Sequence, residues 1–284
     1  MADRLNPMPL VDPVHRFVLF TNAKCGGTTL KAWFFENLDF ATLHWRPATL
    51  VGAFGPAYAA AHLRRGWRLA RRAARAAPGS SDHKEGLRGF VTFYRRAYCS
   101  AAMAADPGAD YRRICVTRHP ARRLVSAYLD KFCSDEARLP FMQDVLRAVG
   151  RDAPSFRDFL GYLETVDERA CNPHWRRQTY VLDGQHIDDF VRIEALHAEM
   201  TRLADVVGAR RLPLLQGRLQ ATRGAEGARA SDVAEDASGL SSSEIAAHRR
   251  ATGRFPPMAS FLTPETSERI RRIYAADFDQ LGYD

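Results

Sequence analysis

One segment near the amino terminus constrains the fold more than any other. A short apolar run, His15–Phe20, leads into the sequence TNAKCGGTTLK at residues 21–31. β-Branched and aromatic residues favour a strand, and Gly-Gly before an amphipathic stretch indicates a tight turn into a helix. We therefore predict a strand over His15–Phe20, a loop, and a helix from about Thr28 to Asn37.

A second unit of the same kind lies about 100 residues further on. The run RICVT, Arg113–Thr117, is followed by Arg118-His119-Pro120 and by an amphipathic stretch over Ala121–Phe132. Strand, loop and helix, repeated with long crossovers, build a parallel sheet flanked by helices. The sequence thus predicts an α/β fold with a central parallel sheet.

The length of 284 residues allows a single domain over residues 1–284. Between the two units, about 45–110, we expect a variable helical insert. There, residues 62–77 place five arginines along one stripe, which is typical of a solvated helix face or of an anion-steering surface. The five are Arg64, Arg68, Arg71, Arg72 and Arg75. Around 217–247, a composition of Gly, Ala, Ser, Arg and Glu predicts a mobile loop.

Three further elements follow from local patterns. Ser155–Leu163 begins with a serine N-cap and an acidic residue three positions later, which predicts a short helix. Asp189–Leu203 reads as a strand entering a helix. Thr263-Pro264-Glu265 is a good helix start, followed by an amphipathic stretch over Thr266–Phe278.

Composition narrows the classes of protein. There are 41 Lys and Arg against 33 Asp and Glu, a net charge of +8, which favours anionic partners. Only four of the basic residues are lysines, and three of these fall in the two motifs below. Five cysteines without a C-x-x-C pair argue against a disulfide framework or a structural zinc site and predict reduced, mostly buried thiols. No stretch is long enough to cross a membrane and no signal-peptide core is present, so we expect a cytoplasmic protein.

The first loop has the chemistry of an anion site. Glycines at 26 and 27 allow backbone N–H groups to approach oxygens closely, and a helix N-terminus carries partial positive charge. Thr28 and Thr29 add hydroxyl donors, and Lys24 adds a cation. The loop is P-loop-like, but the nucleotide-hydrolysing motif G-x-x-x-x-G-K-[ST] has its lysine after the last glycine, whereas Lys24 precedes both.

The second corner offers a second anion site. Arg118 follows the carboxyl end of a predicted strand, where open α/β sheets bind ligands. Ser126 lies eight residues further on, in the following helix. An arginine fork with a helix hydroxyl suits a second phosphate, distant from the first.

Together these residues resemble the sulfotransferase superfamily, whose donor is 3′-phosphoadenosine 5′-phosphosulfate (PAPS). Lys24–Thr29 is similar to its 5′-phosphosulfate loop, and Arg118 with Ser126 is similar to its 3′-phosphate motif. The run RLVSAYLDKF, Arg123–Phe132, resembles the carbohydrate sulfotransferases of sulfotransferase family 2 and their bacterial relatives. Shorter segments also resemble the family. They are Asn172-Pro173-His174-Trp175, Asp189-Phe190 with Arg192-Ile193-Glu194, and the closing Ile273-Tyr274, Asp277-Phe278 and Gly282-Tyr283.

The resemblance implies a PAPS-dependent sulfotransferase, without a metal, that acts by in-line displacement on a hydroxyl of a carbohydrate or glycoconjugate. Lys24 would stabilise charge on the oxygen that bridges sulfur and phosphate. The binding residues that the resemblance implies for the donor are Lys24, Cys25, Gly26, Gly27, Thr28, Thr29, Arg118, Ser126 and, less firmly, Arg249 and Arg250. We expect no nucleic acid partner; contact with a membrane surface and the oligomeric state stay open.

A general base should accept the hydroxyl proton. The candidates are His44, His83 and His174; His174 is also a candidate substrate-binding residue or a structural turn residue. His119 stands where relatives often carry an acidic or amide residue.

Two other classes of function remain open at this point. A phosphotransferase or ATPase could use the same phosphate-binding loop. A non-catalytic binder of polyanions could use the arginine stripe at residues 64–75.

Overall fold

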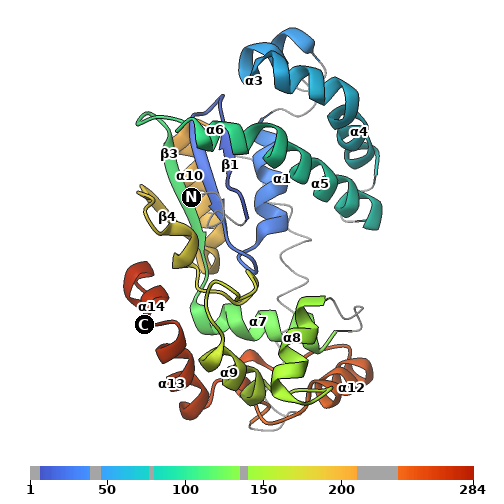
Figure 1. Cartoon of the computed structure of the whole chain (residues 1–284), viewed down its shortest axis with the longest axis vertical. Helices are drawn as coiled ribbons and strands as arrows, with labels where there is room; N and C mark the ends of the chain where they lie inside the picture. Colours follow the sequence, from blue (N-terminus) through green and yellow to red (C-terminus); the bar gives the residue numbers. More distant parts are fainter. Residues whose placement is uncertain (1–6, 39–45, 77–79, 135–139, 210–235) are drawn as a thin grey trace. The chain divides into compact units, whose positions relative to one another are not determined.

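The computed structural model describes residues 7–38, 46–76, 80–134, 140–209 and 236–284. Both predicted strand–loop–helix units are present in it (Figure 1). The chain forms two compact units, each of which is described by itself. The first unit comprises residues 1–21, 26–117 and 184–218, and the second comprises residues 22–25, 118–183 and 219–284. A single domain over residues 1–284 stays a prediction.

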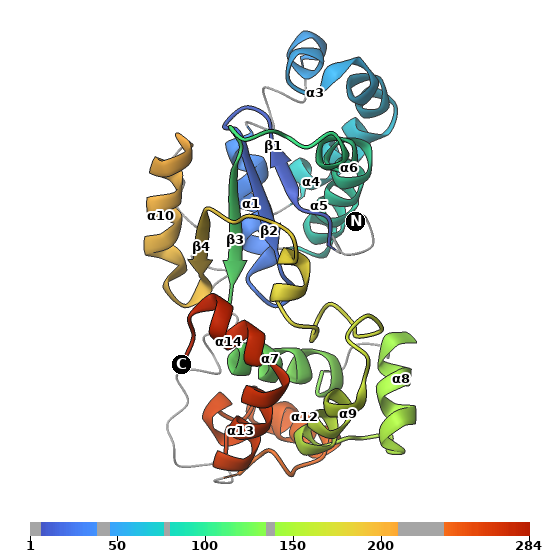
Figure 2. The ribbon, with the colours of Figure 1, turned by 60° about the vertical axis from the view of Figure 1, so that its left-hand side comes forward.

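The first unit is built on a four-stranded sheet in the order β1-β2-β3-β4 (Figure 2). The strands are β1 (Leu10–Asp12), β2 (Phe17–Thr21), β3 (Arg112–Thr117) and β4 (Asp189–Arg192). β2, β3 and β4 are parallel, with Leu19 opposite Ile114 and Cys115 opposite Phe190, while β1 is antiparallel to β2. The predicted α/β fold with a mostly parallel sheet is confirmed.

β2 begins two residues later than the sequence predicts. The carboxylate of Asp12 accepts hydrogen bonds from the backbone N–H groups of Val14 and His15, at 2.8 and 2.9 Å. These bonds close a turn between β1 and β2, which removes His15 from the strand. The three-residue strand β1 that precedes the turn was not predicted.

Helix α1 (Gly27–Asn37) packs against the sheet through aromatic side chains. Trp33 and Phe34 both contact Phe17 of β2, with ring centroids 5.9 and 5.7 Å apart. On its other side, Phe35 contacts Phe90 at 5.0 Å between centroids. α1 therefore joins the sheet to the helices that follow.

The described part of the region 46–104 is mostly helical, with a kink in its first helix at Gly55, where φ is +83° and ψ is 164°. It contains α3 (Pro47–Ala61), α4 (Trp67–Arg75), α5 (Ser81–Tyr94) and α6 (Ser100–Ala104), joined in part by π-helical turns at His62–Gly66 and Arg95–Cys99. α4 and α5 approach closely at Gly86, where a Cβ would lie 2.8 Å from the backbone nitrogen of Ala73. Tyr94 fastens the bundle to the sheet because its hydroxyl donates to the Val11 carbonyl at 2.8 Å.

The predicted arginine stripe lies mainly on the exposed face of this bundle. Arg72 pairs with Asp82 and Glu85 of α5 at 3.2 and 2.8 Å. Arg71 instead covers the ring of Trp67, 5.0 Å from its centroid. The stripe thus behaves in part as a solvated face that braces α4 against α5.

The last element in the described part of the first unit is α10 (Leu196–Val207), which follows β4 as predicted and packs against it (Figure 2). Arg202 of α10 pairs with Asp189 of β4 at 3.0 Å.

The second unit is a helical body around an aromatic core. Its main helices are α7 (Pro120–Phe132), α8 (Pro140–Val149), α9 (Phe156–Thr165), α12 (Ser242–Thr252), α13 (Pro264–Ile273) and α14 (Ala275–Leu281). Tyr128, Phe159 and Trp175 are at most 1% exposed and lie in one hydrophobic cluster. Burial of such large rings supplies most of the stabilisation available to a unit of this size.

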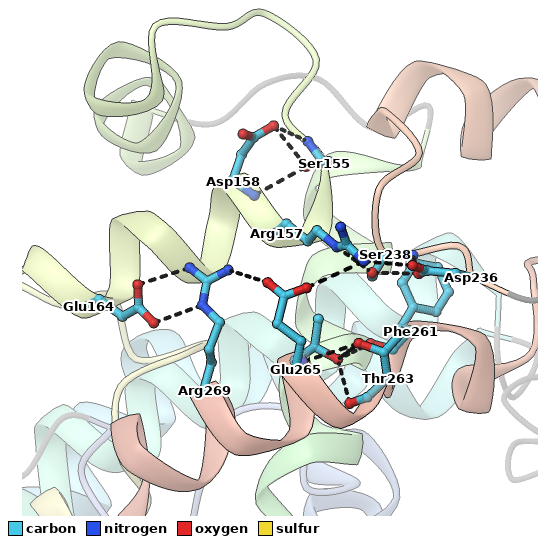
Figure 3. Close-up of polar contacts among 11 residues, drawn as sticks. Ser155, Arg157, Asp158, Glu164, Asp236, Ser238, Phe261, Thr263, Glu265 and Arg269 are labelled. Atoms are coloured by element: carbon cyan, nitrogen blue, oxygen red, sulfur yellow. Dashed lines mark hydrogen bonds and ion pairs between the residues drawn. The ribbon is translucent and has the colours of Figure 1, made fainter.

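Polar contacts at the rim of this core fix α9 and α13 (Figure 3). The Ser155–Asp158 capping box starts α9 as predicted. Arg269 of α13 makes a two-pronged pair with Glu164 of α9 at 2.8 and 2.9 Å. Arg157 of α9 reaches Asp236 at 2.7 Å.

The carboxyl-terminal part of the second unit differs from the sequence predictions in two places. The range predicted as a mobile loop, 217–247, lies outside the described residues up to 235, but α12 begins within it because Ser241 and Glu244 form a capping box. The helix predicted over Thr266–Phe278 is broken at Tyr274, where φ is −112°. The Tyr274 hydroxyl donates to the Trp175 carbonyl, so this buried bond lies at the residue between α13 and α14.

The Tyr274 bond gives a test of the second unit's core. In Tyr274→Phe the Trp175 carbonyl loses its donor, and a buried acceptor left unsatisfied costs about 1–3 kcal/mol. We expect the free energy of unfolding, measured by urea denaturation, to fall by that amount. The matched control is Tyr162→Phe, because the Tyr162 hydroxyl donates to no described atom; a loss equal to that of Tyr274→Phe would contradict the assignment.

Candidate active site

In the first unit, the glycine-rich turn opens directly into α1. Gly26 has φ +68°, a left-handed conformation, and a Cβ there would lie 2.4 Å from the Ile193 side chain. Both facts require glycine. α1 starts without a side-chain cap and without an acidic residue in its first turn. Its first backbone N–H groups therefore lack helical partners and can donate to an anion.

The two threonines at this turn are accessible. Thr28 is exposed and Thr29 is half-buried, and their hydroxyls donate to no atom of the described residues. A hydroxyl pair next to N–H groups of a helix N-terminus has the donors that a phosphate requires.

In the second unit, Lys24 faces helix α7. Lys24 itself has φ +67°, uncommon for a residue with a side chain. Its Nζ lies 3.1 Å from Oδ2 of Asp130, and the Nζ of Lys131 lies 2.8 Å from the same oxygen. One carboxylate therefore neutralises part of the charge of two lysines.

Burial determines the electrostatics of this trio. Burial lowers the pKa of Lys24, and the nearby positive charges of Lys131 and Arg118 lower it further, while Asp130 opposes the shift. Burial alone would raise the pKa of Asp130, but Lys24 and Lys131 outweigh it and hold that pKa below its usual range. An incoming anion would compete with the Asp130 carboxylate for Lys24.

Gln178 joins the Lys24 loop to the Arg118 corner. Its Oε1 accepts from the backbone N–H of Arg118 at 2.9 Å and from the thiol of Cys25 at 3.2 Å. Its Nε2 donates to the Arg118 carbonyl at 2.7 Å. The guanidinium of Arg118 in turn donates to the Lys24 carbonyl at 3.1 Å. Two segments 94 residues apart in the sequence are thus held side by side within the second unit.

Gln178 is itself fixed by a buried carboxylate of α14. Asp277, fully buried, accepts from the backbone N–H groups of Gln178 and Thr179 at 2.8 and 2.9 Å, and from the Thr179 hydroxyl at 2.9 Å. A carboxylate that accepts several N–H and O–H bonds tolerates burial without a cation. The closing segment of the chain therefore supports the site indirectly.

Arg123 closes the other side of the same loop. It is 1% exposed, and its guanidinium donates to the carbonyls of Ala23, Arg176 and Pro173, each at 2.9 Å. Its role is to hold backbone in place, since every described partner is a carbonyl oxygen.

The remaining predicted donor-binding residues lie on two helices of the second unit. Ser126 lies in α7, 9% exposed, and its hydroxyl has no hydrogen-bond partner among the described residues. Arg249 and Arg250 lie in the last turn of α12, where the Arg249 guanidinium covers the ring of Phe255 at 4.4 Å. Their role toward a nucleotide stays a prediction.

The candidate bases have different surroundings. His174 lies in the second unit, where its Nδ1 is 2.7 Å from Oδ1 of Asn172 and its ring stacks on Phe141. Burial lowers its pKa to about 4, and the charges of Lys131 and Lys24 contribute. The bond to Asn172 places the proton on Nδ1 and leaves Nε2 as the acceptor.

The other histidines make contacts of different kinds, and His44 has no described position. His83, in the first unit, has Nδ1 3.0 Å from the Ala73 carbonyl and fastens α5 to α4. His44 lies outside the described residues. His119 makes a contact from Nε2 to the Asp284 carbonyl at 3.2 Å, and its ring packs edge-on against Phe278 and Tyr283.

Residues 8–284 match the sulfotransferase family. The chain belongs to this family. No curated protein and no solved structure gave a significant match. Membership confirms the resemblance drawn from Lys24–Thr29 and from Arg118 with Ser126, and it makes the protein a transferase of the sulfuryl group.

The described part of this sulfotransferase contains neither a membrane-spanning helix nor a metal-binding cluster. No helix there combines the length and apolar character needed to cross a bilayer. No three His, Cys, Asp or Glu side chains there gather into a possible metal site. All five cysteines are buried thiols, as predicted.

Sequence reasoning missed the residues that organise the site. Nothing in the sequence indicated a role for Gln178, because an amide three residues beyond Trp175 belongs to no recognised motif. Asp130 stood inside the run RLVSAYLDKF, and nothing in that run indicated that it pairs with Lys24. Asp277 was noted only as part of a short closing segment that resembles the family.

Gln178 gives the sharpest test of how this sulfotransferase holds its site. Gln178→Leu removes the hydrogen bonds that Gln178 makes to the Arg118 N–H and carbonyl, so we expect the free energy of unfolding to fall by about 2–4 kcal/mol. The control is Gln143→Leu on the exposed face of α8, which should stay within about 0.5 kcal/mol of wild type. Urea denaturation measures both, and equal stability of the two variants would contradict the role of Gln178.

Proposed function

We propose that this sulfotransferase uses PAPS as its donor and transfers the sulfuryl group to a hydroxyl of a carbohydrate or glycoconjugate. The observation that carries the proposal is the Gln178 linkage, which holds Lys24 and Arg118 together in one unit. These residues belong to the two motifs whose family counterparts bind opposite ends of the donor. The donor set consists of N–H groups, hydroxyls, a lysine and an arginine, which suits phosphates.

Residues of the two motifs would divide the donor between them. Arg118 and Ser126 would bind the 3′-phosphate, because a guanidinium offers two parallel N–H donors and Ser126 has a hydroxyl with no described partner. Backbone N–H groups of Gly26–Thr29 and both threonine hydroxyls would bind the 5′-phosphate. Arg249 and Arg250 would add positive charge beside the nucleotide.

Lys24 would supply the main electrostatic stabilisation of the reaction. When bound, the donor brings a sulfur–oxygen bond whose bridging oxygen gains negative charge as the acceptor hydroxyl attacks in line. Lys24, now paired with Asp130, would turn part of its interaction toward that oxygen. A buried ammonium held in advance by its neighbours stabilises such charge without reorganisation.

Among the three histidines, His174 has the geometry of a general base. Asn172 fixes its tautomer with Nε2 as the acceptor, and Lys24 and Lys131 lie within electrostatic reach. Its pKa of about 4 is low for a base, but the negative charge of a bound donor would raise that pKa. His44 and His83 remain the alternatives.

The acceptor and the compartment rest on less direct support. A carbohydrate or glycoconjugate acceptor follows from the resemblance of Arg123–Phe132 to carbohydrate sulfotransferases. The five buried thiols fit a reducing compartment, so we propose that the reaction takes place in the cytoplasm.

The direct test replaces one lysine and leaves the others. Lys24→Met should lower kcat for transfer of label from [³⁵S]PAPS by about 10²–10³-fold, the usual cost of removing one preorganised donor from the developing charge. Asp130 keeps Lys131 as a partner, so Tm should change little.

The control for this substitution is Lys84→Met, on an exposed position of α5. It should retain wild-type kcat. Wild-type turnover in Lys24→Met would refute the role of Lys24, and absence of label transfer from PAPS by the wild-type protein, with every hydroxyl acceptor screened, would refute the proposed function.

A further inference from the structure

Three basic residues of the first unit form a cluster that has no role in the proposed donor site. It consists of Lys31 on α1, Arg88 on α5 and Arg95 in the turn that follows α5. Phe34 and Phe35 of α1 pack against α5, which brings the two helices together (Figure 1). Arg88 and Arg95 are seven residues apart, two helical turns, and so share a face.

Lys31 is directed toward the start of α1. Its Nζ would lie 3.8 Å from a Cβ at Gly27, so the side chain folds back over the first turn of its own helix. Burial, together with the nearby charges of Arg95 and Arg88, lowers the pKa of Lys31 to about 8. No carboxylate among the described residues forms an ion pair with Lys31.

Arg95 lies at the carboxyl end of β2. Its Nη2 donates to the hydroxyl of Thr21, the last residue of that strand, at 3.1 Å. Its Nε is buried and donates to no described atom. The carboxyl ends of parallel strands form the edge of a sheet at which α/β proteins bind ligands.

Several other arginines of the first unit pair with acidic side chains. Arg112 and Arg202 share Asp189, Arg113 pairs with Asp106, and Arg72 pairs with two carboxylates of α5. By contrast, Lys31, Arg88 and Arg95 have no acidic partner among the described residues. Cations drawn together without a counter-charge repel one another, and a bound anion would remove that repulsion.

We propose that Lys31, Arg88 and Arg95 form a binding site for an oxyanion, such as a sulfuryl or carboxylate group. The site rests on residues of the first unit alone. What it serves rests on the proposed function: the oxyanion is either the sulfuryl group of the donor or an acidic group on the acceptor.

Titration with sodium sulfate tests the site directly. Sulfate is added to the full-length protein saturated with 3′,5′-ADP, which occupies the phosphate positions of the donor but carries no sulfuryl group. We expect calorimetry to show sulfate binding to wild type and at least tenfold weaker binding to Lys31→Met and Arg95→Met. Arg96→Met, which removes an exposed arginine from the same turn, is the matched control and should bind like wild type.

Two further measurements separate the sources of the oxyanion. If the site holds the donor's sulfuryl group, Lys31→Met weakens binding of PAPS but not of 3′,5′-ADP. If it holds an acceptor group, both affinities stay unchanged, and the preference for a hexuronate oligosaccharide over its carboxyl-reduced form disappears in the variant.

The outcomes distinguish this site from the proposed function. Equal sulfate affinity in wild type, Lys31→Met and Arg95→Met overturns the site, as does absence of sulfate binding to wild type. If wild type binds neither PAPS nor 3′,5′-ADP, the proposed function fails, and sulfate titration without nucleotide still tests the site. Arg95→Lys, which keeps the charge, and the Tm of each variant without sulfate exclude a loss of fold as the cause.

Discussion

The hydrogen bonds of one buried amide organise the second unit. Gln178 accepts from Arg118 and Cys25 and donates to Arg118, so the Lys24 loop and the corner before α7 are fixed to a common point. Neither segment has regular structure of its own, and neither could hold a long cationic side chain in place alone. Asp277 and Arg123 extend the same arrangement, the first by fixing Gln178 and the second by binding the carbonyl of Ala23.

Lys24 and Lys31, both partly buried, differ in whether an acidic side chain pairs with them. Lys24 is matched by Asp130, which opposes the lowering of the Lys24 pKa by burial and is its partner when no donor is present. Lys31 has no matching carboxylate among the described residues, and burial together with repulsion from Arg95 and Arg88 lowers its pKa to about 8. A matched lysine can act on a charge that develops during a reaction. An unmatched one is stabilised when a charge arrives with a ligand.

The sequence was informative where a local pattern has one structural solution. A strand followed by Gly-Gly and a helix, with Gly26 forced to φ +68°, could be predicted, and so could the capping box at Ser155. The site's supporting contacts could not, because Gln178, Asp277 and Asp130 act across separations of 60 to 153 residues that no local pattern encodes. The break at Tyr274 was also missed, and the bond made there joins Tyr274 to Trp175, 99 residues away in the sequence.

The central claim is that two motif corners bind the two ends of a 3′-phosphorylated nucleotide. Calorimetric binding of 3′,5′-ADP, 5′-AMP and ATP with Mg²⁺ tests it most directly. A charge-assisted hydrogen bond contributes about 1.5–3 kcal/mol, so 3′,5′-ADP should bind about 10–100-fold more tightly than 5′-AMP. That preference should disappear in Arg118→Met, and ATP with Mg²⁺ should bind no better than 5′-AMP. Equal affinity for 3′,5′-ADP and 5′-AMP, or a preference for ATP with Mg²⁺, would contradict the account.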